Sequence, residues 1–158
     1  MVNKKKSVTG SEAGGILLKK GLIVDGTGKK SYIGDVLVKG NRIEAVAAHD
    51  LKFRGRTIDC SGKVIAPGFI DAHSHNDFVM ARKDHRKYTG PFAAQGITTF
   101  VAGNCGFSAA GFEKNSSYRD CIETGGGFFN NSHIPWSTMD DYRAVVQRQG
   151  LTHNMVNL

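Results

Sequence analysis

The sequence predicts an α/β fold in which a parallel sheet follows a small unit of short strands. After Val64, the apolar and β-branched runs 64–70 and 96–104 are separated by segments of helical character, which is typical of a parallel sheet. A third run at 153–158 follows a segment with helix start and stop residues. Before Val64, short apolar runs alternate with turn residues instead. The chain therefore has two parts of different character.

The first part is expected to be a short tail followed by an antiparallel β unit. Residues 1–14 contain three consecutive lysines and no apolar pattern, so we expect a disordered tail. Residues 15–63 have the pattern of short strands. The Gly40-Asn41 step predicts a hairpin within residues 34–46. A unit this small cannot bury two faces alone, so it is expected to pack against another element.

The second part is expected to alternate strands and helices. The elements predicted along it are a buried strand at 64–70, a charged segment at 82–88 leading to a short helix at 90–95, a strand at 96–104, a glycine-rich loop at 125–127, a helix that begins at the N-cap region 137–140 and ends at Gly150, and a strand from 153. Such a sheet has open edges and needs cover on both faces.

The strand at 64–70 leads into two histidines with alternate spacing. Side chains at i and i+2 of a strand share a face, which places His73 and His75 together, about 7 Å apart. Asp77 continues that face if the strand extends. A lone histidine on an apolar strand is usually structural, and a short H-x-H motif often occurs by chance. The position at the carboxyl end of a parallel strand nevertheless favours metal ligation.

Composition excludes several classes of function. The formal charge of +7 comes from scattered Lys and Arg residues without base-stacking aromatic motifs, so a nucleic-acid partner is not expected. No apolar run approaches the ~18 residues of a membrane helix. The amino terminus has no apolar segment typical of a secretory signal. Three cysteines at unrelated spacings favour reduced thiols in a cytoplasmic protein.

Several segments together resemble a known group of enzymes. The sequence is similar to the amidohydrolase superfamily, and within it to the N-acyl-D-amino-acid deacylase (D-aminoacylase) group. The segments that carry the resemblance are LIVDGTG (22–28), GDVLVKGNRIEAV (34–46), IDCSGKVIAPGFIDAHSHND (58–77), QGITTFVAGNCGFS (95–108) and WSTMDDY (136–142). The Gly103-Asn104-Cys105-Gly106 segment is the feature most specific to the D-aminoacylase group.

The resemblance implies an incomplete (β/α)8 barrel preceded by strands of a small β-sandwich. Residues 15–63 would supply the sandwich strands, and residues 64–158 the first strands and helices of the barrel. By position, His73 and His75 resemble ligands of one metal subsite and Cys105 resembles a thiolate ligand of a neighbouring zinc subsite. One or two Zn²⁺ ions would bind, and Asp77 and Asn104 would contact the metal ligands or the substrate. Two further histidines and a catalytic aspartate would come from later strands.

The resemblance also implies a function and leaves alternatives open. The implied activity is zinc-dependent hydrolysis of the amide bond of small-molecule N-acyl-D-amino acids, and the chain is expected to be an amino-terminal fragment that is inactive alone. One alternative is a dihydropyrimidinase-like cyclic amidase. Another is a non-catalytic zinc-binding module that self-associates through its open sheet edge. Structural roles are expected for the remaining cysteines and histidines, which are Cys60, Cys121, His49, His85, His133 and His153.

Overall fold

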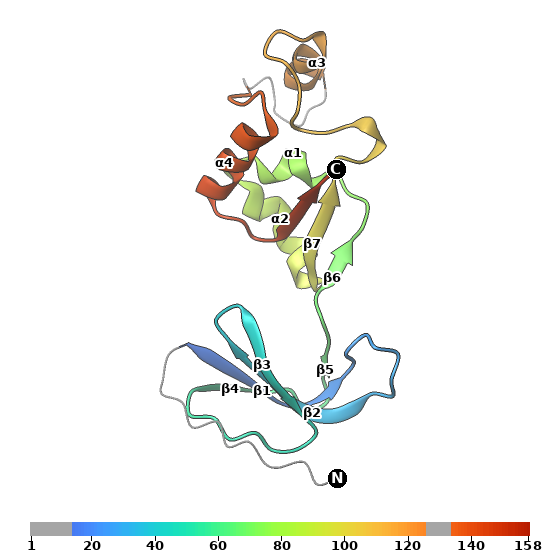
Figure 1. The fold of residues 1–158 in the computed structure, drawn as a ribbon, viewed down its shortest axis with the longest axis vertical. Coiled ribbons are helices and arrows are strands. Elements are labelled where there is room, and N and C mark those ends of the chain that lie inside the picture. Colours follow the sequence, from blue (N-terminus) through green and yellow to red (C-terminus); the bar gives the residue numbers. More distant parts are fainter. Residues whose placement is uncertain (1–13, 126–133) are drawn as a thin grey trace. The chain divides into compact units, whose positions relative to one another are not determined.

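The computed structural model describes residues 14–125 and 134–158, which divide after Pro67 into two compact units (Figure 1). Residues 1–13 of the tail predicted at 1–14, residues 126 and 127 of the predicted glycine-rich loop, and His133 lie outside the described residues. No helix in the described ranges combines the length and apolar character needed to cross a bilayer.

The first unit is a five-stranded sheet. Its strands are β1 (Gly15–Ile23), β2 (Tyr32–Lys39), β3 (Arg42–Ala47), β4 (Arg56–Asp59) and β5 (Val64–Ile65). The sheet order is β3-β2-β1-β4, and β5 also pairs with β1. The predicted hairpin is confirmed, because Lys39 pairs with Arg42 across the β2–β3 turn. The expectation of a purely antiparallel unit is wrong, because β4 and β5 both run parallel to β1.

A buried carboxylate stabilises an irregular point in β1. The pairing of β1 with β2 shifts between Leu18 and Gly21, and Lys20 adopts a left-handed backbone with φ of 60°. Asp35 of β2 accepts hydrogen bonds from the backbone N–H groups of Lys20 and Leu51, both at 2.9 Å. These bonds satisfy both oxygens of a side chain that is almost fully buried. The apolar residues on either side of Lys19 and Lys20 therefore belong to one strand that contains a bulge.

The second unit is a three-stranded parallel sheet with helices in its connections. Its elements are β6 (Phe69–Asp71), α1 (Asn76–Met80), α2 (His85–Ala94), β7 (Ile97–Ala102), the 3-10 turn η1 (Asn104–Gly106), α3 (Ser117–Gly125), α4 (Met139–Gln149) and β8 (Asn154–Asn157). The sheet order is β6-β7-β8, and both pairings are parallel. The predicted parallel sheet is confirmed.

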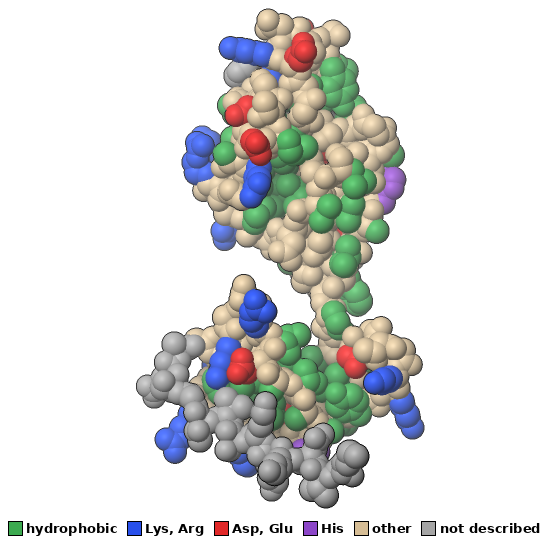
Figure 2. Space-filling view, in the orientation of Figure 1, with side chains coloured by type: hydrophobic (Ala, Val, Ile, Leu, Met, Phe, Trp, Pro, Cys, Tyr) green, Lys and Arg blue, Asp and Glu red, His purple; other side chains and the backbone are tan. Residues whose placement is uncertain are grey.

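The prediction of one buried strand at 64–70 is wrong. The segment is split into β5, which pairs with β1, and β6, which pairs with β7. Pro67 lies between them, lacks a backbone N–H group and restricts the residue before it, so a continuous ladder ends there. Phe100 packs under the helices on one face of the sheet. Ile70 lies on the opposite face and is 65% exposed. Hydrophobic side chains also reach the surface elsewhere in both units (Figure 2).

Two predictions about the helices are confirmed and two need correction. Thr138 is the N-cap of α4 and forms a capping box with Asp141, and Gly150 ends the helix with φ of 82°. Helix α2, however, already begins at His85, so much of the segment expected to precede it is helical. Helix α3 occupies residues to which the sequence pattern assigned no helix, and it ends at Gly125, which was expected in the glycine-rich loop.

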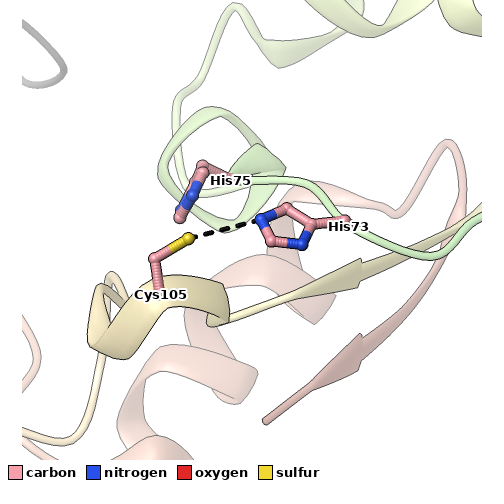
Figure 3. A group of neighbouring side chains, drawn as sticks. All are labelled: His73, His75 and Cys105. Atoms are coloured by element: carbon pink, nitrogen blue, oxygen red, sulfur yellow. Dashed lines mark hydrogen bonds between the residues drawn. The ribbon is translucent and has the colours of Figure 1, made fainter.

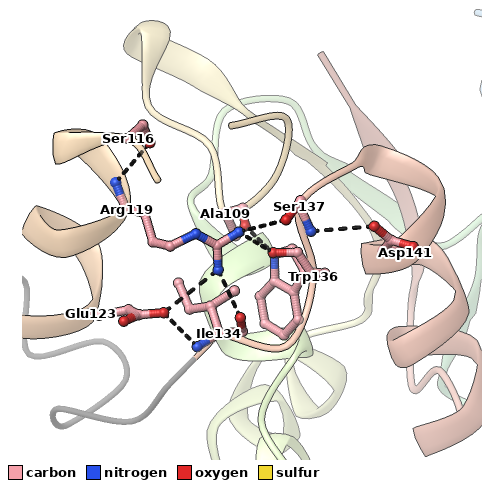
Figure 4. Close-up of polar contacts among 8 residues, drawn as sticks. All are labelled: Ala109, Ser116, Arg119, Glu123, Ile134, Trp136, Ser137 and Asp141. Carbon is pink, nitrogen blue, oxygen red and sulfur yellow. Dashed lines mark hydrogen bonds and ion pairs between the residues drawn. The ribbon is translucent and has the colours of Figure 1, made fainter. Parts of the chain in front are cut away.

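Arg119 of α3 holds the segment that leads into α4 (Figure 4). Its guanidinium donates to the carbonyl oxygens of Ile134 at 2.7 Å and Trp136 at 2.6 Å, and to the Ser137 hydroxyl at 2.8 Å. Glu123 lies 3.6 Å from the same guanidinium and accepts a hydrogen bond from the Ile134 N–H group. A buried loop without secondary structure needs such partners for its backbone carbonyls.

Replacing Arg119 by lysine should lower the free energy of unfolding by about 2 kcal/mol. The ammonium group cannot reproduce the fork of donors that serves two buried carbonyl oxygens. Chemical denaturation would measure the change. The control is R148K in α4, where the side chain is exposed and little change is expected. Equal stability of R119K and R148K would contradict the role assigned to Arg119.

His153, just before β8, is a buried group whose titration should affect stability. Its ring packs on Phe100 at a centroid distance of 4.5 Å, and burial lowers its pKa below the ordinary value of 6.5. Below that pH the unfolded chain takes up a proton that the folded chain does not accept. The contribution of His153 to the free energy of unfolding is therefore complete above the ordinary pKa and is lost as the pH falls below it.

The variant H153F should have a shallower loss of stability on acidification below about pH 6.5 than the unmodified chain. It keeps a ring against Phe100 and removes the titrating group. Urea unfolding at a series of pH values would measure the slope. The exposed Ile43 provides the control, since I43F adds a ring without removing a titrating group and should keep the original slope. An unchanged slope in H153F would refute the assignment.

Candidate metal centre

The two predicted histidines lie in the loop after β6 and not in the strand. Strand β6 ends at Asp71, and α1 begins at Asn76. The Ser74 N–H group donates to the carbonyl oxygen of Val101 in β7 at 2.9 Å, which ties the loop to the neighbouring strand. His73 is exposed and His75 is half-buried, and their ring centroids lie 6.0 Å apart. The expected convergence occurs, but it arises from the loop.

Cys105 approaches the histidines from the loop after β7. Gly103, Cys105 and Gly106 all have positive φ, at 80°, 62° and 65°. Glycine adopts this conformation freely, whereas a residue with a Cβ atom pays about 1–2 kcal/mol. At Gly103, a Cβ atom would also lie 2.7 Å from the carbonyl oxygen of Leu158. The chain thus turns sharply enough to direct the Cys105 side chain back over the edge of the sheet.

The three side chains form one cluster (Figure 3). Cys105 Sγ lies 3.3 Å from His73 Nε2, and the ligand atoms of His73, His75 and Cys105 all lie within 4.8 Å of one another. Ligand atoms on a tetrahedral zinc ion, at its usual Zn–S and Zn–N distances, are separated by about 3.5 Å. A thiolate with two imidazoles is a donor set suited to zinc.

The polar environment of His75 fits a ligand role. Its Nδ1 atom is buried and has no hydrogen-bond partner among the described residues. Buried ring nitrogens normally have a partner, because loss of hydration is otherwise uncompensated. Histidine coordinates metal ions through either ring nitrogen. The donor set and its separations therefore fit a metal ion, and the ligand role of the three residues stays a prediction.

Asn104 and Asp77, both expected to contact the metal ligands or the substrate, lie in different surroundings. Asn104 Nδ2 donates to the carbonyl oxygens of Ser74 at 3.2 Å and Val101 at 2.9 Å, so it contacts the histidine loop and strand β7. Asp77 does not continue the face of His73 and His75 along a strand, because it lies in α1 and is fully buried. Burial raises the pKa of Asp77, and the Ala109 N–H group, which donates to Oδ2 at 2.7 Å, opposes that shift.

The other histidines and cysteines among the described residues lie outside the cluster. His49 is exposed in a loop of the first unit. His85 is buried with both ring nitrogens beside backbone carbonyl oxygens, those of Arg82 and Gly150. Cys60 is buried and Cys121 is exposed, and neither is in a disulfide.

Asn157, at the carboxyl end of β8, is a polar residue at this edge that the sequence analysis did not single out. Its Nδ2 atom donates to the Ser108 hydroxyl at 3.3 Å, in the loop that follows Cys105. Strand β8 is parallel to β7, so its carboxyl end lies at the same edge of the sheet. A polar residue at the end of a predicted strand could have identified this position.

Comparison with known proteins identifies the family. Residues 56–156 match the family model described as the amidohydrolase family. The chain belongs to the amidohydrolase family. Among curated proteins of Alcaligenes xylosoxydans xylosoxydans, a D-aminoacylase is 40% identical over 95 residues and an N-acyl-D-glutamate deacylase is 36% identical over 95 residues. Each alignment covers 60% of this chain and 19% of the relative.

Solved structures of amidohydrolases share the fold. A crystal structure of D-aminoacylase matches with a TM-score of 0.69 and 34% identity, over 90% of this chain and 29% of that one. The N-acyl-D-glutamate deacylase of Bordetella bronchiseptica, solved with zinc and a phosphonate inhibitor, matches with a TM-score of 0.66 and 32% identity, over 90% of this chain and 28% of that one. The α/β fold class and the D-aminoacylase resemblance are confirmed. The chain spans less than a third of the length of these relatives.

The backbone of Cys105 provides a test of how this turn is built. C105G should be more stable than C105A by about 1 kcal/mol, because glycine accepts the left-handed conformation and alanine does not. Cys121, exposed within helix α3, is the matched control with the opposite expected sign, since glycine is the poorer residue in a helix. Thermal unfolding of the four metal-free variants would measure both differences. The same sign at both positions would contradict the strained turn.

Proposed function

We propose that this chain forms a zinc site of an amidohydrolase that cleaves the amide bond of N-acyl-D-amino acids. The observation that carries the proposal is the convergence of His73, His75 and Cys105 from two loops at the carboxyl edge of a parallel sheet. The names of the relatives, D-aminoacylase and N-acyl-D-glutamate deacylase, support the substrate class. The solved deacylase that holds zinc supports the choice of metal.

The residues of the cluster would hold the metal and leave room for substrate. His73 and Cys105 are exposed, so the centre opens to solvent on one side, while the half-buried His75 closes the other. A bound Zn²⁺ would lower the pKa of a water molecule and polarise the acyl carbonyl. Three protein ligands leave a position for such a molecule in a tetrahedral set.

We propose that the 158 residues bind metal without hydrolysing substrate. Within residues 14–125 and 134–158, the only cluster of possible ligands contains no carboxylate. Asp77 is fully buried within α1 and accepts a hydrogen bond from the Ala109 N–H group, so it is not placed to take a proton from water at the cluster. Amide hydrolysis needs a general base within hydrogen-bond reach of the attacking water. The expected base and the two further histidines would come from other segments.

Metal content is the direct test of the site. The chain, stripped with chelator and reloaded, should hold about one zinc ion, and H73A, H75A and C105A should each hold much less. With Co²⁺ in place of zinc, the sulfur-to-metal absorption band should disappear in C105A and persist in C121A. Equal zinc content in the unmodified chain and all three ligand variants would refute the site.

Acetate release from N-acetyl-D-amino acids by the zinc-loaded chain tests the second part of the proposal. The expected result is no release above the rate of the buffer. Zinc-dependent release that is lost in C105A would show that the chain supplies its own base and would overturn this part.

A further inference from the structure

Asn104 connects the two loops that carry the cluster. Its side-chain Nδ2 atom donates to the carbonyl oxygen of Ser74 at 3.2 Å and to that of Val101 at 2.9 Å. Ser74 lies between His73 and His75, and Asn104 directly precedes Cys105. The Val101 carbonyl oxygen also accepts a hydrogen bond from the Ser74 N–H group at 2.9 Å. One amide therefore contacts the backbone of the histidine loop while its own backbone leads into the cysteine.

The chemistry of these contacts is specific to an amide nitrogen. Both partners are carbonyl oxygens, which only accept hydrogen bonds, so the group between them must supply two N–H donors. An aspartate of the same shape has no donor when ionised and would repel both oxygens. Alanine would leave the oxygens without this partner. Asparagine is thus the residue of this size that can join the two loops.

The backbone around Asn104 explains why such a connection matters. Cys105 has a φ of 62°, and Gly103 and Gly106 on either side of Asn104 and Cys105 are also left-handed. A cysteine in this conformation relaxes unless its surroundings hold it. Relaxation would rotate the direction of the Cys105 side chain and move Sγ away from His73 Nε2, which now lies 3.3 Å away.

We infer that Asn104 is a positioning residue that sets the geometry of the metal centre before metal binds. This inference rests on the proposed function, since it assigns Asn104 a role toward the same site. It assigns no chemical step to the side chain. Residues that orient ligands in this way typically change metal affinity by about 10–100-fold when they are replaced.

The experiment compares N104D and N104A with T89V. Thr89 is buried, and its hydroxyl contacts the His85 carbonyl oxygen at 3.1 Å and the Thr152 hydroxyl at 3.0 Å, so T89V removes a polar group with two partners outside the cluster. Zinc affinity is measured by competition with a chromophoric chelator. We expect about 10–100-fold weaker binding in both Asn104 variants and an affinity within about threefold of the original in T89V. The Co²⁺–thiolate absorption band should also shift or weaken only in the Asn104 variants.

Amide hydrogen exchange in the metal-free protein supplies a second readout. The Ser74 N–H group should lose protection in N104D, whereas the Leu158 N–H group, bonded to the Ala102 carbonyl oxygen at 3.0 Å, should keep it. A general loss of stability would lower protection at both positions.

The outcomes separate the inference from the proposed function. Metal binding by the unmodified chain with equal affinity in N104D overturns the positioning role and leaves the zinc site intact. An equal loss of affinity in T89V and N104D also overturns it, because stability alone would explain the change. Absence of zinc binding by the unmodified chain overturns the proposed function, and with it the role of Asn104 toward that site. The inference is supported by weakened zinc binding together with selective loss of protection at Ser74.

Discussion

Strands β6 and β7 run parallel, and therefore their carboxyl ends lie at the same edge of one sheet. This pairing brings together His73 and Cys105, which are 32 positions apart in the sequence. The hydrogen bond from the Ser74 N–H group to the Val101 carbonyl oxygen continues the contact between the two segments beyond the end of β6. Every contact of the candidate centre depends on these backbone bonds, because the histidine loop has no regular structure of its own.

The core beneath the sheet edge holds the second loop in place. The Asp77 carboxylate accepts a hydrogen bond from the Ala109 N–H group, and the Trp136 indole donates one to the Ala109 carbonyl oxygen at 2.6 Å. The Tyr142 hydroxyl donates to the backbone carbonyl oxygen of Asp77 at 2.7 Å. Helices α1 and α4 and the segment after Cys105 thus share one buried polar network, in which each hydrogen bond is strengthened by its apolar surroundings. The position of the Cys105 loop is therefore set by packing as well as by its glycines.

Local patterns in the sequence predict the features that depend on neighbouring residues. The hairpin at Gly40-Asn41, the capping box at Thr138 and the parallel strands all follow from short motifs. The parallel direction of β4 does not, because it depends on which distant strand completes its hydrogen bonds. The division of residues 64–70 has a local signal in Pro67, but the two different partner strands of β5 and β6 do not. Helix α3 was missed although the Ser116 hydroxyl, which accepts the Arg119 N–H group at 3.2 Å, is a local start signal. The contacts of the Arg119 side chain with residues 134–137 are long-range, and no local pattern shows them.

The same limit applies to the candidate centre. The H-x-H spacing and the glycine-flanked cysteine identify which residues could bind a metal. The convergence of His73, His75 and Cys105 does not come from the register of a strand, as the sequence predicted. It comes from a bent loop, a left-handed cysteine and an asparagine that joins two backbones. The strain at Cys105 has a physical consequence for the proposed zinc site. Because the folded chain holds the thiol in place before coordination, less ordering remains to oppose binding, and a bound ion would in turn stabilise this edge of the sheet. On the proposed function, metal binding and amide hydrolysis are separable properties, because the cluster among the described residues offers two imidazoles and a thiol but no carboxylate.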